Sequence, residues 1–448
     1  MNKIKDLRSF IEVLEAEGEL ERVKKEIDKD NEIGPVIATL EKENRGAVIF
    51  EKIKSFNSQV IGGVLANHNR IALSLNCSPE DVRKKVANAL KNPIPPQKTD
   101  EAPVQEIIMR GDEVDLTQIP IPCHAPKDGG PFITAGVTVS KDYDSSRQNL
   151  SYQRMQIKGK KKMGIMINEW RHLRGFLDKA EADNKPLPIA VVVGADPTIM
   201  IAAGFRYDGD ETELAGALRN NPIPVTKCIT SEIMVPANAE YVIEGEIKPN
   251  IREKEGPLAE FTGHYGIPWE SPVIEVKAIT KRKNAIWQTL NGASHEHINL
   301  GNVLPREPLL FEKVSYVSDN IVNVHIPPYG SGFLAVVSIN KKNPGEPKNV
   351  AMAAMTAYVN IKNVIVVDSD VDIYNSTDLM WALSNRVVAE KDIFYVNGAQ
   401  GHELDPASDE RGVQTKMGID ATLWEEVNDL ERAIYPDVNL NDYIINNE

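Results

Sequence analysis

The sequence is poor in the residues and patterns that mark several classes of protein. It holds three cysteines, Cys77, Cys123 and Cys228, and no CxxC pair in 448 residues. Their odd number and wide spacing predict neither a disulfide framework nor a zinc knuckle, so we expect a reduced, cytoplasmic protein. No apolar run approaches 18 residues, and the N-terminus lacks a signal-peptide core and a cleavage site, so we expect no membrane partner.

Positive charge is scarce relative to negative charge. The chain carries 51 Lys and Arg against 65 Asp and Glu, a formal net charge of −14. Without a basic excess, we expect no nucleic-acid partner. We find no internal repeat and no low-complexity tract. An apolar fraction of 42% in a chain of this length predicts a folded protein with more than one core.

The spacing of apolar residues predicts three sections and a tail. Helices and short strands mix over 1–110, and β-rich runs separated by turns follow over 111–304, which favours a β-barrel or β-sandwich with inserted helices. Over 305–425, the strands FLAVVSIN and VIVVDSDVDI alternate with helical runs, as in an α/β domain. The spacing predicts an amphipathic helix over 421–436, most of which belongs to the tail, 426–448. We expect this helix and tail to pack on their own domain or on a neighbouring subunit. The predicted class is α/β (α+β).

The stretch EGPLAEFTGHYG, residues 255–266, places Glu255 and Glu260 close together on a loop rich in glycine. Two such acids on their own are typical of a solvated surface. A carboxylate pair near an arginine can also transfer protons, because the arginine keeps one acid ionised while burial or repulsion raises the pKa of the other. Gly256-Pro257 stiffens this loop, which favours a position at the edge of a cleft.

The stretch NLSYQRMQI, residues 149–157, supplies a candidate arginine. We predict one continuous strand here, with Tyr152, Arg154 and Gln156 on the same face. The alternative is a half-exposed strand with an arginine on the surface.

Three further residues form a candidate metal site. Asn149, His172 and Glu213 offer an amide oxygen, an imidazole and a carboxylate. This set suits Mn²⁺ or Mg²⁺ better than zinc, particularly if phosphate oxygens complete the coordination. The alternative for Glu213 is an acid favoured by the dipole at a helix N-terminus. Together with an Arg–Glu–Glu set, the site predicts an enzyme with a phosphorylated cofactor.

The run NGASHEHINLGNVLPRE, residues 291–307, carries His295, His297 and Arg306, and His325 follows it. These side chains are candidates for holding a second anionic or polar group of a substrate. The alternative is a polar loop away from the site.

Six motifs follow one another along the chain, in the order NLSYQRMQ, RHLR, DETELAGAL, EYVIEGEI, EGPLAEFTGHYG and VIVVDSDVDI. Through these motifs the chain resembles the UbiD family of reversible decarboxylases, which use prenylated FMN. The resemblance covers essentially the whole chain. It implies a UbiD-like three-part fold with an N-terminal α/β section, a central split β-barrel related to flavin reductases and a C-terminal α/β domain. It also implies a homodimer or homohexamer and a flavin prenyltransferase that supplies the cofactor.

The resemblance assigns roles to positions in this sequence. It implies a catalytic set of Arg154, Glu255 and Glu260, with Glu260 as the proton donor. It implies Mn²⁺ on Asn149, His172 and Glu213, and K⁺ on the loop that contains Ala202, Ala203 and Phe205. The cofactor contacts that it implies are Asn149, Tyr152, Gln153, Arg154, Arg171, His172, Ala203, Phe205, Glu213 and Lys362.

The implied activity is the reversible, non-oxidative release of CO₂ from an aromatic, heteroaromatic or α,β-unsaturated acid. A furan-2,5-dicarboxylate or hydroxybenzoate type of acid is the expected substrate. The alternatives are a phosphorylated unsaturated acid of the anhydromevalonate phosphate type, or a non-catalytic flavin-binding subunit of a carboxylase complex. A flavin redox protein would not need Arg154 with two glutamates, and a carboxylate-pair hydrolase would not explain the Asn–His–Glu set.

Overall fold

The computed structural model describes residues 4–142, 144–145, 147–169, 171–409 and 411–424, together with 432, 433 and 435. Except for residues 432, 433 and 435, the predicted tail over 426–448 lies outside the described residues, as does most of the helix predicted over 421–436. Within the described part of the chain, no helix is long and apolar enough to cross a membrane.

The N-terminal section is a four-stranded sheet with helices packed against it. Its strands lie in the order β1 (Leu20–Val23), β2 (Ala47–Phe50), β3 (Gln59–Gly62) and β16 (Ile286–Thr289). β16 comes from far along the chain and pairs in parallel with β3, so this sheet contains a strand that follows the barrel strands in sequence. The helices are α1 (Leu7–Ala16), α2 (Ile33–Lys42), α3 (His68–Leu75) and α4 (Val82–Lys91).

Local sequence explains the first helix well. Asp6 accepts a hydrogen bond from the Ser9 amide, and the Ser9 hydroxyl accepts one from the Asp6 amide, which makes a capping box. The side chains at positions 7, 10, 11 and 14 form one apolar face of this helix, and all four are buried.

The central section is a nine-stranded, mostly antiparallel sheet. Its strands lie in the order β6-β9-β10-β15-β14-β11-β7-β8, and β5 also pairs with β15. Their bounds are β5 (Ile107–Arg110), β6 (Phe132–Ile133), β7 (Val137–Lys141), β8 (Gln148–Tyr152), β9 (Met155–Gly159), β10 (Lys162–Ile165), β11 (Leu187–Val193), β14 (Tyr241–Glu255) and β15 (Trp269–Lys281). Helices α5 (His172–Ala182), α6 (Pro197–Ala202) and α7 (Glu211–Arg219) lie between the strands along the chain.

The central sheet curls on itself, and its two ends meet at Gln153 and Arg154. β8 is the last strand in the sheet order and β9 is the second, yet β8 ends at Tyr152 and β9 begins at Met155. The chain between those two residues spans at most about 11 Å. The sheet is therefore a barrel that is split beside these two residues. The prediction of one continuous strand over 149–157 is wrong, because the chain leaves one edge of the sheet and enters the other.

Both faces of the central sheet are buried. On β11, Ala190 and Val192 belong to a core shared with the N-terminal section and with α6 and α7. Ile189, Val191 and Val193 belong to a second core, which also contains Trp287. A small sheet of β13 (Met234–Pro236), β12 (Pro224–Lys227) and β4 (Gln97–Lys98) joins the segment after α4 to this section.

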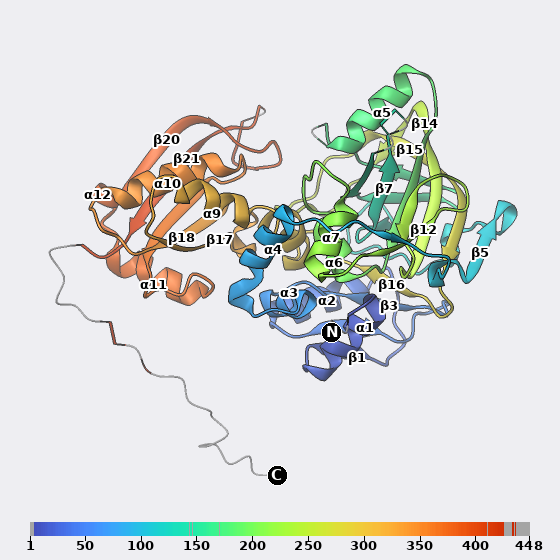
Figure 1. The fold of residues 1–448 in the computed structure, drawn as a ribbon, viewed down its shortest axis with the longest axis horizontal. Coiled ribbons are helices and arrows are strands. Elements are labelled where there is room, and N and C mark those ends of the chain that lie inside the picture. The colour runs from blue at the N-terminus through green and yellow to red at the C-terminus, as the bar shows by residue number, and fades with distance from the viewer. Residues whose placement is uncertain are drawn as a thin grey trace, which may run out of the picture.

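The C-terminal section has the predicted βαβ connection. Its sheet order is β17-β18-β19-β21-β20, in which β18, β19 and β21 run parallel. The bounds are β17 (Ile321–His325), β18 (Leu334–Ile339), β19 (Asn363–Asp368), β20 (Ile393–Gln400) and β21 (Val413–Ala421), with helices α9 (Glu307–Ser315), α10 (Glu346–Ala357), α11 (Ser376–Arg386) and α12 (Ala389–Asp392). Figure 1 shows this section, in orange, beside the barrel and the N-terminal section. Helix α8 (His295–Ile298) and the π-helical turn over 299–303 lead from the barrel into it.

Candidate active site

Arg154 lies at the split of the barrel and binds both predicted glutamates. Its Nη2 and Nε donate to the two carboxylate oxygens of Glu255, at 2.7 and 3.1 Å. Its Nη1 donates to Glu260. The Glu255 side chain is fully buried, whereas 14% of the Glu260 side chain is exposed. The structure therefore brings the predicted Arg–Glu–Glu set together.

The two carboxylates differ in environment. Burial raises the pKa of Glu255 above its ordinary value, although the charge of Arg154 and its hydrogen bonds act in the opposite direction. Glu255 is the last residue of β14, so its backbone is fixed in the sheet. Glu260 stands on a tight loop, where its amide donates to the His264 carbonyl and the Gly266 amide donates to the Leu258 carbonyl. One acid thus anchors the arginine, and the other reaches the open space beside it.

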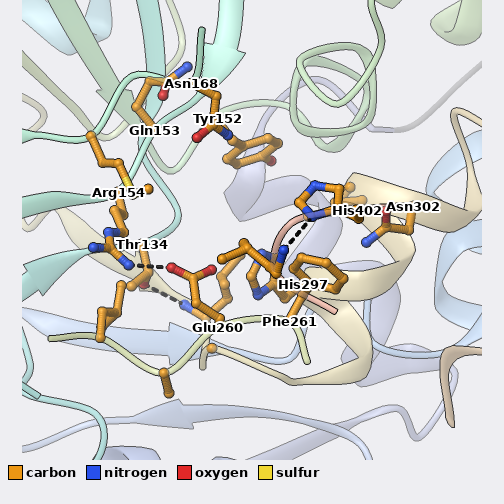
Figure 2. A pocket seen from close by; sticks show the side chains of 18 of the residues that line it. Thr134, Tyr152, Gln153, Arg154, Asn168, Glu260, Phe261, His297, Asn302 and His402 are labelled. Atoms are coloured by element: carbon orange, nitrogen blue, oxygen red, sulfur yellow. Dashed lines mark hydrogen bonds and ion pairs between the residues drawn. The ribbon is translucent and has the colours of Figure 1, made fainter. Parts of the chain in front are cut away.

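The open space is a cavity of about 200 Å³ that the barrel, the loop after β14 and the C-terminal section enclose together. Figure 2 shows Glu260 and Arg154 on one side of it and Asn302 and His402 on the other. The residues that line it are Thr134, Tyr152, Gln153, Arg154, Met166, Asn168, Arg171, Leu258, Ala259, Glu260, Phe261, Leu290, Gly292, His297, Leu300, Gly301, Asn302, Tyr358, Asn360, His402 and Leu404.

Two neutral histidines flank the residue after Glu260. The Phe261 ring packs edge-on against His297, with centroids 6.4 Å apart, and against His402 at 5.5 Å. Burial lowers the pKa of both imidazoles, while the nearby charge of Glu260 acts in the opposite direction. The cavity wall beside Glu260 is therefore aromatic and uncharged near neutral pH.

The four residues predicted for the substrate separate in space. Only His297 lines the cavity. The Arg306 guanidinium lies 4.0 Å from the ring centre of Tyr358, which does line it. His325 hydrogen-bonds to Glu307 at 2.8 Å and packs against Tyr374, and the His295 amide donates to Glu41 in the N-terminal section. For His295 and His325 the structure supports the alternative, a place away from the cavity.

The far wall of the cavity carries polar groups that sequence reasoning missed. Asn302 and Asn360 are both buried and lie 3.4 Å apart, between the Asn360 amide nitrogen and the Asn302 oxygen. Among the described residues, the Asn360 oxygen and Nδ1 of His297 are buried without a hydrogen-bond partner. Unpaired buried polar atoms are costly, so this wall is suited to a ligand that can hydrogen-bond to it.

The acid beside Asn149 in the structure is not the predicted Glu213. The Asn149 amide nitrogen donates to Glu211 at 2.9 Å, and the Leu150 amide donates to the same carboxylate at 2.7 Å. Glu211 is fully buried, and burial raises its pKa to about 8. Glu213 contacts neither residue; its carboxylate lies near Gly209, at the surface of the loop before α7. The acid that the structure brings to Asn149 is therefore Glu211 and not Glu213.

His172, the third predicted ligand, contacts a neighbouring arginine. Its Nδ1 lies 3.3 Å from Nη2 of Arg147, which also donates to the Tyr207 carbonyl at 2.9 Å. In the described part of the chain, no group of three His, Cys, Asp or Glu side chains is close enough to hold a metal. Asn149, His172 and Glu211 include only two residues of those four types. Their amide oxygen, imidazole nitrogen and carboxylate are nevertheless donors of the kind that bind Mn²⁺ or Mg²⁺.

Two arginines at the cavity lack an acid. Arg171 lines the cavity and Arg306 stacks on Tyr358, and among the described residues neither makes an ion pair with a carboxylate, in contrast to Arg154. Burial lowers the pKa of Arg171, and the positive charges of Arg306 and Arg206 act in the same direction. A buried guanidinium without a counter-charge is costly. This side of the cavity is therefore suited to anionic ligands such as a phosphate.

The remaining cofactor predictions fall into two groups. Tyr152, Gln153 and Arg171 line the cavity. Ala202 ends α6, and it is buried together with Ala203 and Phe205 just after it. Gly204 between them packs closely against the carbonyl of Leu300, a residue that lines the cavity. Lys362 binds Asp405 at 2.8 Å instead of facing the cavity. A K⁺ site on this turn and a contact between Lys362 and a cofactor stay predictions.

Comparison with known families gives three consecutive matches. The N-terminal, Rift-related and C-terminal domains of 3-octaprenyl-4-hydroxybenzoate carboxy-lyase (UbiD) match residues 11–90, 96–294 and 300–421. Together these matches span most of the described chain.

Two similar proteins share one named activity with each other. The anhydromevalonate phosphate decarboxylase of Methanothermobacter thermautotrophicus is 35% identical over 86% of this chain and 90% of its own length. That of Methanosarcina mazei is 34% identical over 96% of this chain and 99% of its own.

A solved structure of the UbiD-class enzyme HmfF from Pelotomaculum thermopropionicum, in complex with FMN, is 38% identical and superposes with a TM-score of 0.93. The match covers 98% of this chain and 100% of that chain. An evolved dimeric form of HmfF in complex with prFMN is 35% identical, with a TM-score of 0.89 and the same coverage.

Removal of Arg154 from its pair with Glu255 should make the stability of the protein depend on pH. Arg154→Met leaves the buried Glu255 charge unpaired and should destabilise the protein by about 3 kcal/mol near pH 8. Without the arginine, the pKa of Glu255 rises further above its ordinary 4.5. The folded variant then binds more protons than the unfolded chain in that window, so its stability increases as the pH falls toward 5.

Thermal unfolding of wild type and variant between pH 5 and pH 8 tests this dependence. We expect the gap between their melting temperatures to narrow on acidification, and we expect Arg154→Met combined with Glu255→Gln to remove most of the gap at pH 8. A gap that stays constant or widens toward pH 5 would contradict the account.

Proposed function

Since the chain belongs to the UbiD family of carboxy-lyases and is a decarboxylase, we propose that it releases CO₂ from an unsaturated acid that carries a second anionic group. Glu260 is the proton donor in this proposal. The observation that carries it is the position of Glu260: it is bound to Arg154 and open to a cavity whose remaining lining is neutral apart from Arg154 and Arg171.

The reaction needs one proton and a place for one electron pair. The bond between the carboxylate carbon and its neighbour breaks, CO₂ leaves, and the neighbouring carbon receives a proton. Prenylated FMN, when bound, supplies the acceptor for the electron pair. Glu260 delivers its proton to the carbon and must be protonated again in each turnover. Arg154 orients the substrate carboxylate, and Glu255 holds Arg154 in place.

The prenylated FMN is the expected cofactor because the site fits its phosphate. Arg147 lies 3.3 Å from His172, Arg171 directly precedes His172 and lines the cavity, and neither arginine pairs with a carboxylate among the described residues. The complexes of HmfF with FMN and with prFMN support the same choice. We expect a flavin prenyltransferase to supply it, and a homodimer or a larger homo-oligomer as the working form.

We propose a phosphorylated unsaturated acid of the anhydromevalonate phosphate type as the substrate. The two curated relatives with that activity support it, as do Arg306 behind Tyr358 and the unpaired polar atoms of His297 and Asn360. A second anionic group at this wall would meet hydrogen-bonding groups directly, and the charge of Arg306 would act on it from behind the Tyr358 ring. A furan dicarboxylate also carries two charges, whereas a hydroxybenzoate carries one.

We further propose that Mn²⁺ or Mg²⁺ binds Asn149, His172 and Glu211, with the cofactor phosphate completing its coordination. The contact between Asn149 and Glu211 supports this set in place of the one with Glu213. When bound, the ion would hold the phosphate next to the arginines and leave the cavity free for the acid.

The substrate proposal is tested with protein co-expressed with a flavin prenyltransferase. We expect its absorbance and mass to match prenylated FMN. Among anhydromevalonate phosphate, furan-2,5-dicarboxylate and 4-hydroxybenzoate, we expect the phosphorylated acid to give the largest kcat/KM, by about 100-fold or more, because the other acids leave the far wall unpaired. Preference for either of the other acids would refute the substrate, and turnover of none by the loaded protein would refute the proposed function.

The metal set is tested by Mn²⁺ titration of the protein with FMN present. Glu211→Gln should weaken Mn²⁺ binding at least about 100-fold, because it removes a charged ligand, whereas the matched Glu213→Gln should leave it within about 3-fold. Calorimetry, or the electron paramagnetic resonance signal of free Mn²⁺, measures both. The reverse order of the two variants would return the role to Glu213.

A further inference from the structure

A short segment before the barrel, residues 125–130, packs along the loop that carries Glu260. We name these residues the bracing segment, and we name residues 256–266 the acid loop. The Gly129 amide donates to the Pro257 carbonyl at 2.7 Å, and the Lys127 amide donates to the Tyr265 hydroxyl at 3.2 Å. The bracing segment thus holds the acid loop on both sides of Glu260.

Asp128 makes the contact nearest to Glu260. One of its carboxylate oxygens accepts a hydrogen bond from the Ala259 amide at 3.1 Å, and the other accepts one from the Ala125 amide at 2.8 Å. Ala259 directly precedes Glu260, so this bond fixes the peptide that leads into the proton donor. Burial raises the pKa of Asp128, whereas its backbone hydrogen bonds and the more distant Arg154 lower it.

The other side of Ala259 is confined as well. A Cβ atom at Gly292 would lie only 2.0 Å from the Ala259 carbonyl oxygen, so the two backbones are in direct contact there. Ala259 is therefore held between the Asp128 carboxylate and the backbone of the cavity wall. A shift of the acid loop in either direction would break a hydrogen bond or create a clash.

Gln156 ties the same frame to Arg154. Its amide nitrogen donates to the Gly129 carbonyl at 2.6 Å, and its oxygen accepts from the Gly256 amide at 3.1 Å. Gln156 lies on β9, two residues after Arg154. The strand that positions the arginine therefore also holds the bracing segment and the start of the acid loop.

We propose that Asp128 is a positioning residue for the decarboxylation, which acts by fixing Glu260 through the Ala259 amide. Arg154 restrains the Glu260 carboxylate, and Asp128 restrains its backbone, so the proton donor keeps one place in the cavity. The inference rests on the proposed role of Glu260. Asp128 contacts no reacting group in this account, and its effect is confined to the geometry of proton delivery.

The test compares Asp128→Ala with a matched control, Glu244→Ala. Glu244 is buried on β14 and also accepts two backbone amides, from Ile229 and Thr230, but it does not line the cavity. Hydrogen–deuterium exchange of the acid-loop peptide and the kinetics of the loaded enzyme with anhydromevalonate phosphate are measured for both variants. Melting temperatures report the loss of stability.

We expect Asp128→Ala to speed exchange in the acid loop and to lower kcat about 100-fold with KM within about 3-fold, since a misplaced donor affects the chemical step and not binding. Asp128→Asn, which keeps one of the two hydrogen bonds, should give an intermediate kcat and serves if the alanine variant does not fold. Glu244→Ala should lower the melting temperature while kcat stays within about 3-fold.

Unchanged exchange in the acid loop overturns the inference, as does faster exchange with wild-type kcat. A fall in kcat of the same size in Glu244→Ala would reduce the effect to general stability and overturn it too. If the wild-type enzyme turns over no acid, the proposed function fails, and the exchange measurement alone then decides whether Asp128 holds the loop.

Discussion

The buried ion pair between Arg154 and Glu255 is the contact on which the arrangement of the site depends. Burying a carboxylate removes its hydration, and this cost must be compensated by an oppositely charged, hydrogen-bonding partner. Arg154 is that partner, because it donates hydrogen bonds to both oxygens of Glu255. This requirement fixes the guanidinium at the split of the barrel. The third nitrogen of the guanidinium donates to Glu260. The position of the proton donor therefore depends on the buried Arg154–Glu255 pair.

The rest of the cavity is built around that fixed point by segments far apart in the chain. The barrel supplies Arg154, the turn over 299–303 supplies Asn302, and a loop after β20 supplies His402. Burial keeps His297 and His402 neutral, so charge is concentrated at the Arg–Glu–Glu set and at the arginines without acids. An anionic substrate and an anionic cofactor would both stabilise these arginines. Binding of either anion would therefore compensate the positive charge at the cavity.

Local patterns in the sequence were enough for much of the fold. The β-rich runs predicted the central sheet, and the alternation of strands and helices predicted the βαβ connection of the C-terminal section. The break at Gln153 and Arg154 was not visible, because the alternation of side chains continues through it. Glu211 and Glu213 both lie in the first turn of α7, about 200° apart around the helix, and only contact with β8 shows which one faces Asn149. His295 and His325 are near His297 in sequence, but the chain turns them toward other partners, and no local signal marks His402.

The central claim is that Glu260 moves the proton, and exchange at the product carbon tests it most directly. The loaded enzyme is incubated in D₂O with the decarboxylated product of whichever acid it turns over, and deuterium at the carbon that carried CO₂ is followed by mass spectrometry. The account predicts that wild type exchanges this hydrogen and that Glu260→Gln slows the exchange at least about 100-fold while the cofactor stays bound. Exchange at the wild-type rate in loaded Glu260→Gln would contradict it.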